Sequence, residues 1–268
     1  MSLEASTKTL EYELVNPDNQ QQIADALKQE TEGFGKGIDP VEVPEVLKFV
    51  AGNGHVWLQY AVEGTVRNPK GVIELISLEK TLKFGDSDIA ATIDVSSSPL
   101  NVITGNQEVA FQYARRFADD KNITYHHGIS MSRRGKGYGT LLLNYALNNT
   151  PNLKDRVAVC FIDAAKIADG KLRPAANESS YTIHMKSGFF LAGVVEPPVY
   201  DDTITYYSVV RPRNSKPFRF SGQEKLIRFD EQDANKTIQQ VRELTSQGYV
   251  GVSYDRKTHE IIFRKLRI

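Results

Sequence analysis

The stretch that decides the fold is Ile129-Ser130-Met131-Ser132-Arg133-Arg134-Gly135-Lys136-Gly137-Tyr138-Gly139-Thr140, followed at once by Leu141-Leu142-Leu143-Asn144-Tyr145-Ala146-Leu147. An apolar strand enters a basic, glycine-rich turn, and the turn opens a leucine-rich helix. Backbone N–H groups in such a turn converge on one anion, and the helix N-terminus adds partial positive charge. The stretch therefore predicts a cradle for a phosphate or pyrophosphate group, with a plain glycine-containing turn as the alternative.

The composition is that of an ordinary globular protein. The chain has 268 residues, 40% hydrophobic and 25% charged, with a formal net charge of zero. A neutral balance favours neither nucleic acid nor an anionic membrane as a partner. The single cysteine, Cys160, excludes an intramolecular disulfide and fits a reducing compartment, so we expect a cytoplasmic protein. No apolar run is long enough to span a bilayer.

Hydrophobic periodicity predicts an alternation of strands and helices. We expect strands over 11–15, 56–62, 72–78, 123–131, 157–162, 189–195, 204–210, 226–229, 249–254 and 260–268. We expect helices starting at 16–18, over 45–51, around 109–117, after the glycine turn, over 177–186, and from 234 to a stop at Gly248. The prediction divides the chain into a domain over 1–212, with an inserted segment at about 79–122, and a small βαββ unit over 213–268. The small unit packs on the core or on a partner subunit.

The usual phosphate motifs do not fit the turn. A P-loop requires Ser or Thr after Gly-Lys, whereas Gly135-Lys136 is followed by Gly137. A dinucleotide fingerprint requires G-x-G-x-x-G, whereas the glycines here follow G-x-G-x-G.

A second motif lies downstream, in Asn177-Glu178-Ser179-Ser180-Tyr181-Thr182-Ile183-His184-Met185-Lys186-Ser187-Gly188-Phe189-Phe190. Together with Arg134-Gly135-Lys136-Gly137-Tyr138-Gly139, this segment resembles the GCN5-related N-acetyltransferase (GNAT) superfamily, in which the turn reads Arg/Gln-x-x-Gly-x-Gly/Ala. The resemblance covers roughly residues 10–212. It implies a mixed α+β fold with a central, mostly antiparallel, splayed sheet flanked by helices.

The resemblance also implies an acyl-CoA co-substrate, either acetyl-CoA or another acyl-CoA. The strand before the turn would splay from its neighbour so that pantetheine adds to it like a strand. The charged side chains of the turn would add affinity or form a solvated rim. Asn177 matches a family asparagine or is a plain N-cap. The residues implied for the cofactor are Ile129, Arg133, Arg134, Gly135, Lys136, Gly137, Tyr138, Gly139, Thr140 and Asn177.

Three residues are implied for the chemistry. The His127 N–H would lie near the thioester carbonyl as an oxyanion donor. His184 falls where many members carry a tyrosine that protonates the leaving thiolate; a packed helix histidine is the alternative. Tyr181, one turn earlier, is the rival acid. The general base is unassigned, because Ile123 stands where the family glutamate is expected. No spacing indicates a metal.

Two functions fit these patterns. The first is an N-acyltransferase that transfers an acyl group, most simply acetyl, from acyl-CoA to an amine of a small molecule or peptide. The second is a non-catalytic acyl-CoA sensor on a degenerate fold of the same kind. Neither requires nucleic acid or a membrane, and a homodimer is left open.

Overall fold

The computed structural model describes residues 9–34, 44, 47–48, 51–52, 54–63, 65–77, 123–131, 137–150, 157–168, 171–174, 178–195, 203–211, 219–230 and 233–267. The chain divides into two compact units. Unit 1 comprises Met1–Ile76 and His127–Thr150, and unit 2 comprises Ser77–His126 and Pro151–Ile268.

Unit 1 is a layered α+β structure. Its elements are β1 (Thr9–Leu14), α1 (Gln20–Phe34), β2 (Gly54–Glu63), β3 (Val66–Ser77), the second part of β4 (Ile123–Met131) and α6 (Tyr138–Asn149). The strand order is β1-β2-β3-β4, and β2 is antiparallel to both β1 and β3. The predicted hairpin of β2 and β3 is confirmed, with both strands longer than the sequence indicated.

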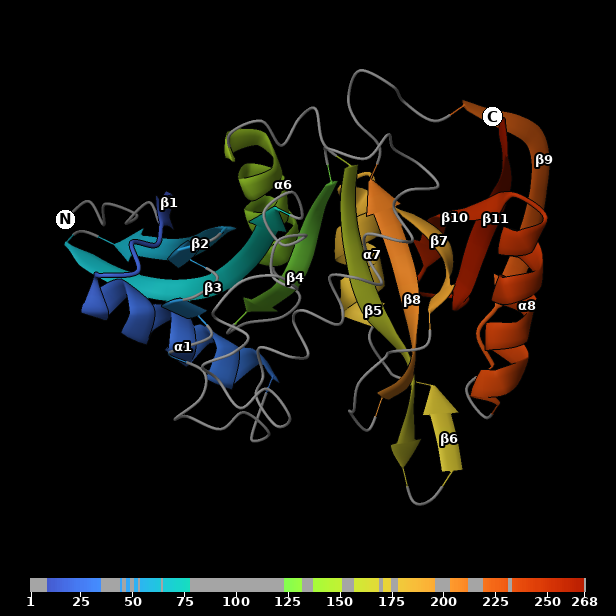
Figure 1. Ribbon diagram of the computed structural model, residues 1–268, viewed down its shortest axis with the longest axis horizontal. Coiled ribbons are helices and arrows are strands. Elements are labelled where there is room, and N and C mark those ends of the chain that lie inside the picture. The colour runs from blue at the N-terminus through green and yellow to red at the C-terminus, as the bar shows by residue number, and fades with distance from the viewer. Residues whose placement is uncertain are drawn as a thin grey trace, which may run out of the picture. The chain divides into compact units, whose positions relative to one another are not determined.

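Helices α1 and α6 cover opposite faces of β2, which Figure 1 shows with α1 below and α6 above the strands. Alternate side chains of a strand point to opposite faces. Tyr60 hydrogen-bonds Asp25 of α1, whereas Trp57 meets Tyr145 of α6 edge-on at 5.4 Å between ring centroids. Both faces of β2 are therefore buried. The core includes Ile23, Ala26, Val56, Leu58, Ile73, Leu142, Leu143, Ala146 and Leu147.

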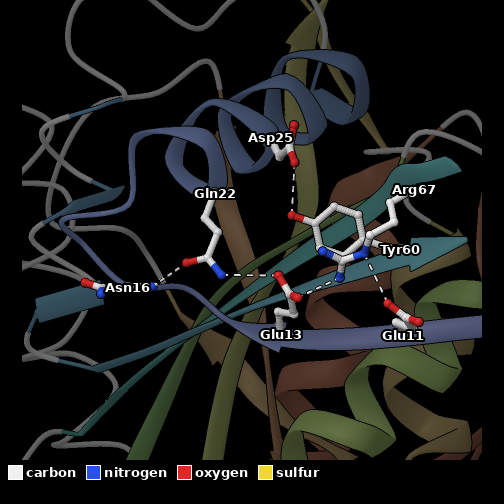
Figure 2. A network of polar contacts seen from close by, with 7 residues as sticks. All are labelled: Glu11, Glu13, Asn16, Gln22, Asp25, Tyr60 and Arg67. Atoms are coloured by element: carbon white, nitrogen blue, oxygen red, sulfur yellow. Dashed lines mark hydrogen bonds and ion pairs between the residues drawn. The ribbon is translucent and has the colours of Figure 1, made fainter. Parts of the chain in front are cut away.

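A polar network ties α1 to the strands (Figure 2). Arg67 of β3 donates to Glu11 at 3.1 Å and to Glu13 at 2.7 Å, and its guanidinium lies 4.2 Å from the Tyr60 ring centroid. Burial alone would raise the pKa of Glu13, but hydrogen bonds from Arg67 and Gln22 and the charge of Arg67 outweigh it and lower that pKa. The network therefore links strands β1, β2 and β3 to one another and to helix α1.

Unit 2 contains the first part of β4 and the elements from β5 onward. These are β5 (Val157–Ala168), β6 (Lys171–Pro174), α7 (Glu178–Lys186), β7 (Phe190–Val195), β8 (Thr203–Arg211), β9 (Arg219–Arg228), α8 (Ala234–Ser246), β10 (Tyr249–Asp255) and β11 (Glu260–Arg267). The strand order is β4-β5-β8-β7-β10-β11-β9, with β6 on β5. The short strand β6 was not predicted from the sequence.

The β4–β5 pair is parallel and short. Its register covers four residue pairs, from Ile123↔Val157 to His126↔Cys160, although the two strands have 9 and 12 residues. The other described strand pairs of unit 2 are antiparallel. The mixed α+β class and the mostly antiparallel, splayed sheet are thus confirmed.

The C-terminal elements continue the sheet of unit 2. β10 pairs with β7 through Gly251↔Leu191, and β11 joins β10 to β9. Figure 1 shows α8 beside β10 and β11. Asp233 is the N-cap of helix α8, and its side chain accepts from the Lys236 N–H. The helix is followed by Gly248 at φ +80°, as predicted.

Gly251 allows β10 to approach β7. A Cβ built at this position lies 2.8 Å from Ile261 Cγ2 and 3.0 Å from Leu191 Cβ. We expect Gly251→Ala to lower the free energy of unfolding by about 1 to 2 kcal/mol, because the packed strands would have to shift. Chemical denaturation measures this change. Gly222→Ala on β9 is the matched control, because nothing lies within 4 Å of a Cβ there. Equal stability of Gly251→Ala and Gly222→Ala would show that Ile261 and Leu191 leave room for a Cβ at position 251.

Several predictions concern parts of the chain outside the described residues. These are the inserted segment at about 79–122 with its helix near 109–117, and residues 212–218, where the predicted domain boundary falls. The division at residue 212 stays a prediction.

Candidate functional site

The N-terminus of α6 is the centre of the candidate site. Its first intrahelical hydrogen bond runs from the Leu141 N–H to the Gly137 carbonyl oxygen at 3.1 Å. The N–H groups of Tyr138, Gly139 and Thr140 precede this bond and point out of the helix end. No side chain caps the helix and its first turn holds no acidic residue. This end of the helix therefore presents N–H donors and positive dipole without a competing carboxylate.

Gly137 sets the geometry of this helix start. It lies at φ 78° and ψ −1°, in the left-handed region that favours glycine. A Cβ built on Gly137 would meet no described atom within 4 Å, so the backbone conformation rather than a neighbouring atom disfavours a side chain there. Gly137 is exposed and Gly139 is buried. The predicted glycine-led helix start is confirmed.

Only part of the predicted cofactor set falls within the described residues. Ile129 is half-buried on β4, and Gly137 to Thr140 form the start of α6. The backbone of His127 belongs to the part of β4 beyond its pairing with β5. Asn177 lies outside the described residues, as do Arg133, Arg134, Gly135 and Lys136. Their assignment stays a prediction.

His184 is buried in α7 and only 1% exposed. Its Nδ1 lies 2.8 Å from the Ser180 carbonyl oxygen, which can only accept, so Nδ1 carries the ring proton. Burial lowers the pKa of His184 to about 4, although this hydrogen bond acts to raise it. The ring also packs edge-on against Phe189, with centroids 5.1 Å apart. At pH 7 His184 is a neutral core histidine with its proton on Nδ1.

Tyr181 is also buried, at 3% exposure, in an aromatic cluster. Its ring stacks on Phe229 at 5.4 Å and lies 5.7 Å from Tyr254, centroid to centroid. Phe229 and Tyr254 belong to the C-terminal part of unit 2. This part of the chain therefore packs directly on α7 and forms part of the surroundings of Tyr181.

Sequence reasoning missed one buried polar residue beside α6. Gln59 of β2 is 0% exposed, and its Nε2 lies 3.4 Å from the Tyr138 carbonyl oxygen. Sequence alone does not reveal such a residue, because a polar residue in an alternating strand pattern is predicted to face solvent.

Two other features of the described part of the chain complete the site description. It contains no cluster of three or more His, Cys, Asp or Glu side chains placed to hold a metal ion. None of its helices is both long and apolar enough to cross a membrane.

Comparison with known proteins gives matches among solved structures. No protein-family model and no curated protein matches the sequence. A polyamine N-acetyltransferase from Drosophila melanogaster, which forms N-acetylagmatine, matches with 10% identity and a TM-score of 0.50 over 75% of this chain and 99% of its own. An agmatine N-acetyltransferase mutant matches with 12% identity and a TM-score of 0.50 over 75% of this chain and 98% of its own. A GNAT-family acetyltransferase from Streptococcus pneumoniae matches with 13% identity and a TM-score of 0.43 over 77% of this chain and 100% of its own.

Proposed function

Because this chain has the fold of the GNAT acetyltransferases, we propose that it is an acyl-CoA-dependent N-acyltransferase, most simply an N-acetyltransferase. The observation that carries the proposal is the start of α6, which is led by Gly137 and has no side-chain cap. The acceptor is a primary amine of a small molecule or a peptide.

The proposed donor site uses the backbone of unit 1. The N–H groups of Tyr138, Gly139 and Thr140 would bind the diphosphate of the acyl-CoA, since a helix N-terminus favours an anion. Ile129 would offer its backbone to the pantetheine amides in the manner of an added strand. The short β4–β5 register supports this, because β4 residues beyond His126 are outside that pairing.

In the proposed reaction, the amine nitrogen forms a bond to the thioester carbonyl carbon and the carbon–sulfur bond breaks. The amine loses one proton, the departing thiolate gains one, and the products are an amide and CoA. The chain contributes chiefly by holding donor and acceptor together. The His127 N–H is the proposed donor to the carbonyl oxygen as negative charge develops on it.

The departing thiolate needs a proton donor. His184 was predicted as the acid and Tyr181 as its rival. A neutral His184 with its proton on Nδ1 held by Ser180 has none to give from Nε2. The structure thus favours the packing interpretation of His184. Tyr181 remains the alternative donor, although it is 3% exposed.

A second candidate function is a non-catalytic acyl-CoA sensor. The burial of both predicted acids, His184 and Tyr181, favours it. A sensor would use the same donor site at α6 but would have no amine acceptor.

A thiol-release screen separates the two functions. We expect at least one amine in a broad panel of polyamines, aminoglycosides, amino acids and peptides to release free CoA from acetyl-CoA faster than background hydrolysis. Longer acyl-CoAs tested in parallel report the acyl preference. Binding of acetyl-CoA without release by any amine would leave the sensor as the function, and no binding at all would overturn both.

A further inference from the structure

Gln59 lies in a position that no simple packing role explains. It is 0% exposed on β2, on the face that α6 covers. Its Nε2 is within reach of two acceptors, the Tyr12 hydroxyl at 3.3 Å and the Tyr138 carbonyl oxygen at 3.4 Å. Its Oε1 is buried with no hydrogen-bond partner among the described residues. A buried amide with one atom unsatisfied costs stability, and an apolar side chain of similar size would avoid that cost.

The carbonyl that Gln59 contacts belongs to a particular peptide. The Tyr138 C=O and the Gly139 N–H are the two ends of one peptide unit, and that N–H is one of three that precede the first intrahelical bond of α6. A donor on the carbonyl fixes the plane of the peptide. It also polarises the unit, which makes the N–H at the other end a stronger donor.

The neighbouring aromatic residues hold Gln59 in place. The Tyr12 ring stacks on Tyr145 of α6, with centroids 3.9 Å apart and planes 8° from parallel. Trp57, on the same face of β2, donates from Nε1 to Thr150 at 2.9 Å just beyond the end of α6. The helix is therefore anchored along its length to one face of β2, and Gln59 lies at the end that carries the N–H donors.

We propose that Gln59 is a positioning residue for diphosphate binding: it orients and polarises the Tyr138–Gly139 peptide so that the Gly139 N–H binds the diphosphate of the acyl-CoA. The proposal rests on the proposed function, since it concerns the same donor site.

The test compares ligands with and without a diphosphate. Dissociation constants for CoA and for pantetheine, which lacks the diphosphate, are measured by calorimetry for the unchanged protein and for Gln59→Met. We expect CoA to bind about three- to tenfold more weakly to Gln59→Met, since one hydrogen bond is lost. Pantetheine affinity should be unchanged, which a general loss of packing would not produce.

Two further variants sharpen the result. Tyr12→Phe removes the competing acceptor but keeps the stack on Tyr145, so CoA affinity should be retained. Gln29→Met makes the same chemical change at a glutamine of α1 that is also 0% exposed, and it should leave CoA binding unaltered. Should Gln59→Met not fold, Gln59→Glu keeps the shape, replaces the donor by an acceptor, and should weaken CoA binding at least as much.

The outcomes distinguish the two proposals. If the unchanged protein binds CoA and Gln59→Met binds it equally well, the role of Gln59 is overturned while the proposed function stands. Equal weakening of CoA and pantetheine, or equal effects of Tyr12→Phe and Gln59→Met, would also overturn it. No CoA binding by the unchanged protein would overturn the proposed function itself.

Discussion

We expect the Gly137→Val variant to lose the thermal protection that acetyl-CoA gives to the unchanged protein. Gly137 lies at φ 78°, where a β-branched residue is strained. The variant can relieve the strain only by changing the backbone that begins α6, and the N–H groups there would no longer converge. A ligand at one hundred times its dissociation constant stabilises a protein by about 2.7 kcal/mol, and this protection should disappear.

Gly137→Asn is the matched control for this experiment. Asparagine tolerates the left-handed region better than other side chains do, and a Cβ at this position meets nothing within 4 Å. We expect Gly137→Asn to keep most of the protection. Melting curves with and without acetyl-CoA provide the measurement. Full protection of Gly137→Val would contradict the assignment of this turn to the diphosphate, whereas loss in both variants would point to steric blocking.

The second large effect concerns His184 and pH. The pKa of this histidine is lowered from 6.5 to about 4 in the folded protein. Between these values the unfolded chain binds a proton at this side chain that the folded chain does not. The free energy of unfolding should therefore fall as the pH is lowered from 6.5 to 4, at about 1.4 kcal/mol per pH unit from this group. Above pH 6.5 the ring is neutral in both states, so His184 makes a constant contribution to the free energy of unfolding.

His184→Phe and His184→Gln remove the titrating group. We expect the stability difference between the unchanged protein and either variant to shrink by roughly 3 kcal/mol between pH 7 and pH 4. Denaturation curves at several pH values measure it. Turnover at pH 7, measured well below the melting temperature, should change little. A fall in turnover of about 10²- to 10⁴-fold with an unaltered pH slope would instead make His184 the acid.

The start of α6 was predictable because its determinants are local. Gly135, Gly137 and Gly139 follow an apolar strand and precede a leucine-rich helix, and the left-handed conformation of Gly137 is a choice open mainly to glycine. Gly188 and Gly248, which end helices α7 and α8, are predictable for the same reason, since both adopt the left-handed conformation, with φ values of 83° and 80°. Such signals depend on a few adjacent residues, so they can be recognised without knowing how the rest of the chain folds.

The roles of His184 and Gln59 depended on distant parts of the chain. His184 lies on a short helix with polar residues on several sides, and its pKa follows from burial that Phe189 and the surrounding core create. The burial of Gln59 follows from α6 covering β2, 79 residues further along the chain at Tyr138. Neither contact leaves a periodic signal in the local sequence.

Local sequence patterns were sufficient to locate the strand, the glycine turn and the helix of the proposed donor site, and together with the second motif they indicated the fold class. Backbone conformation at a glycine and the hydrophobic period of a helix are properties of neighbouring residues. Three features became visible only in the folded chain: β10 joins β7 through Gly251, burial lowers the pKa of His184, and Gln59 contacts the first turn of α6. Desolvation and long-range hydrogen bonds arise only when segments distant in sequence pack together.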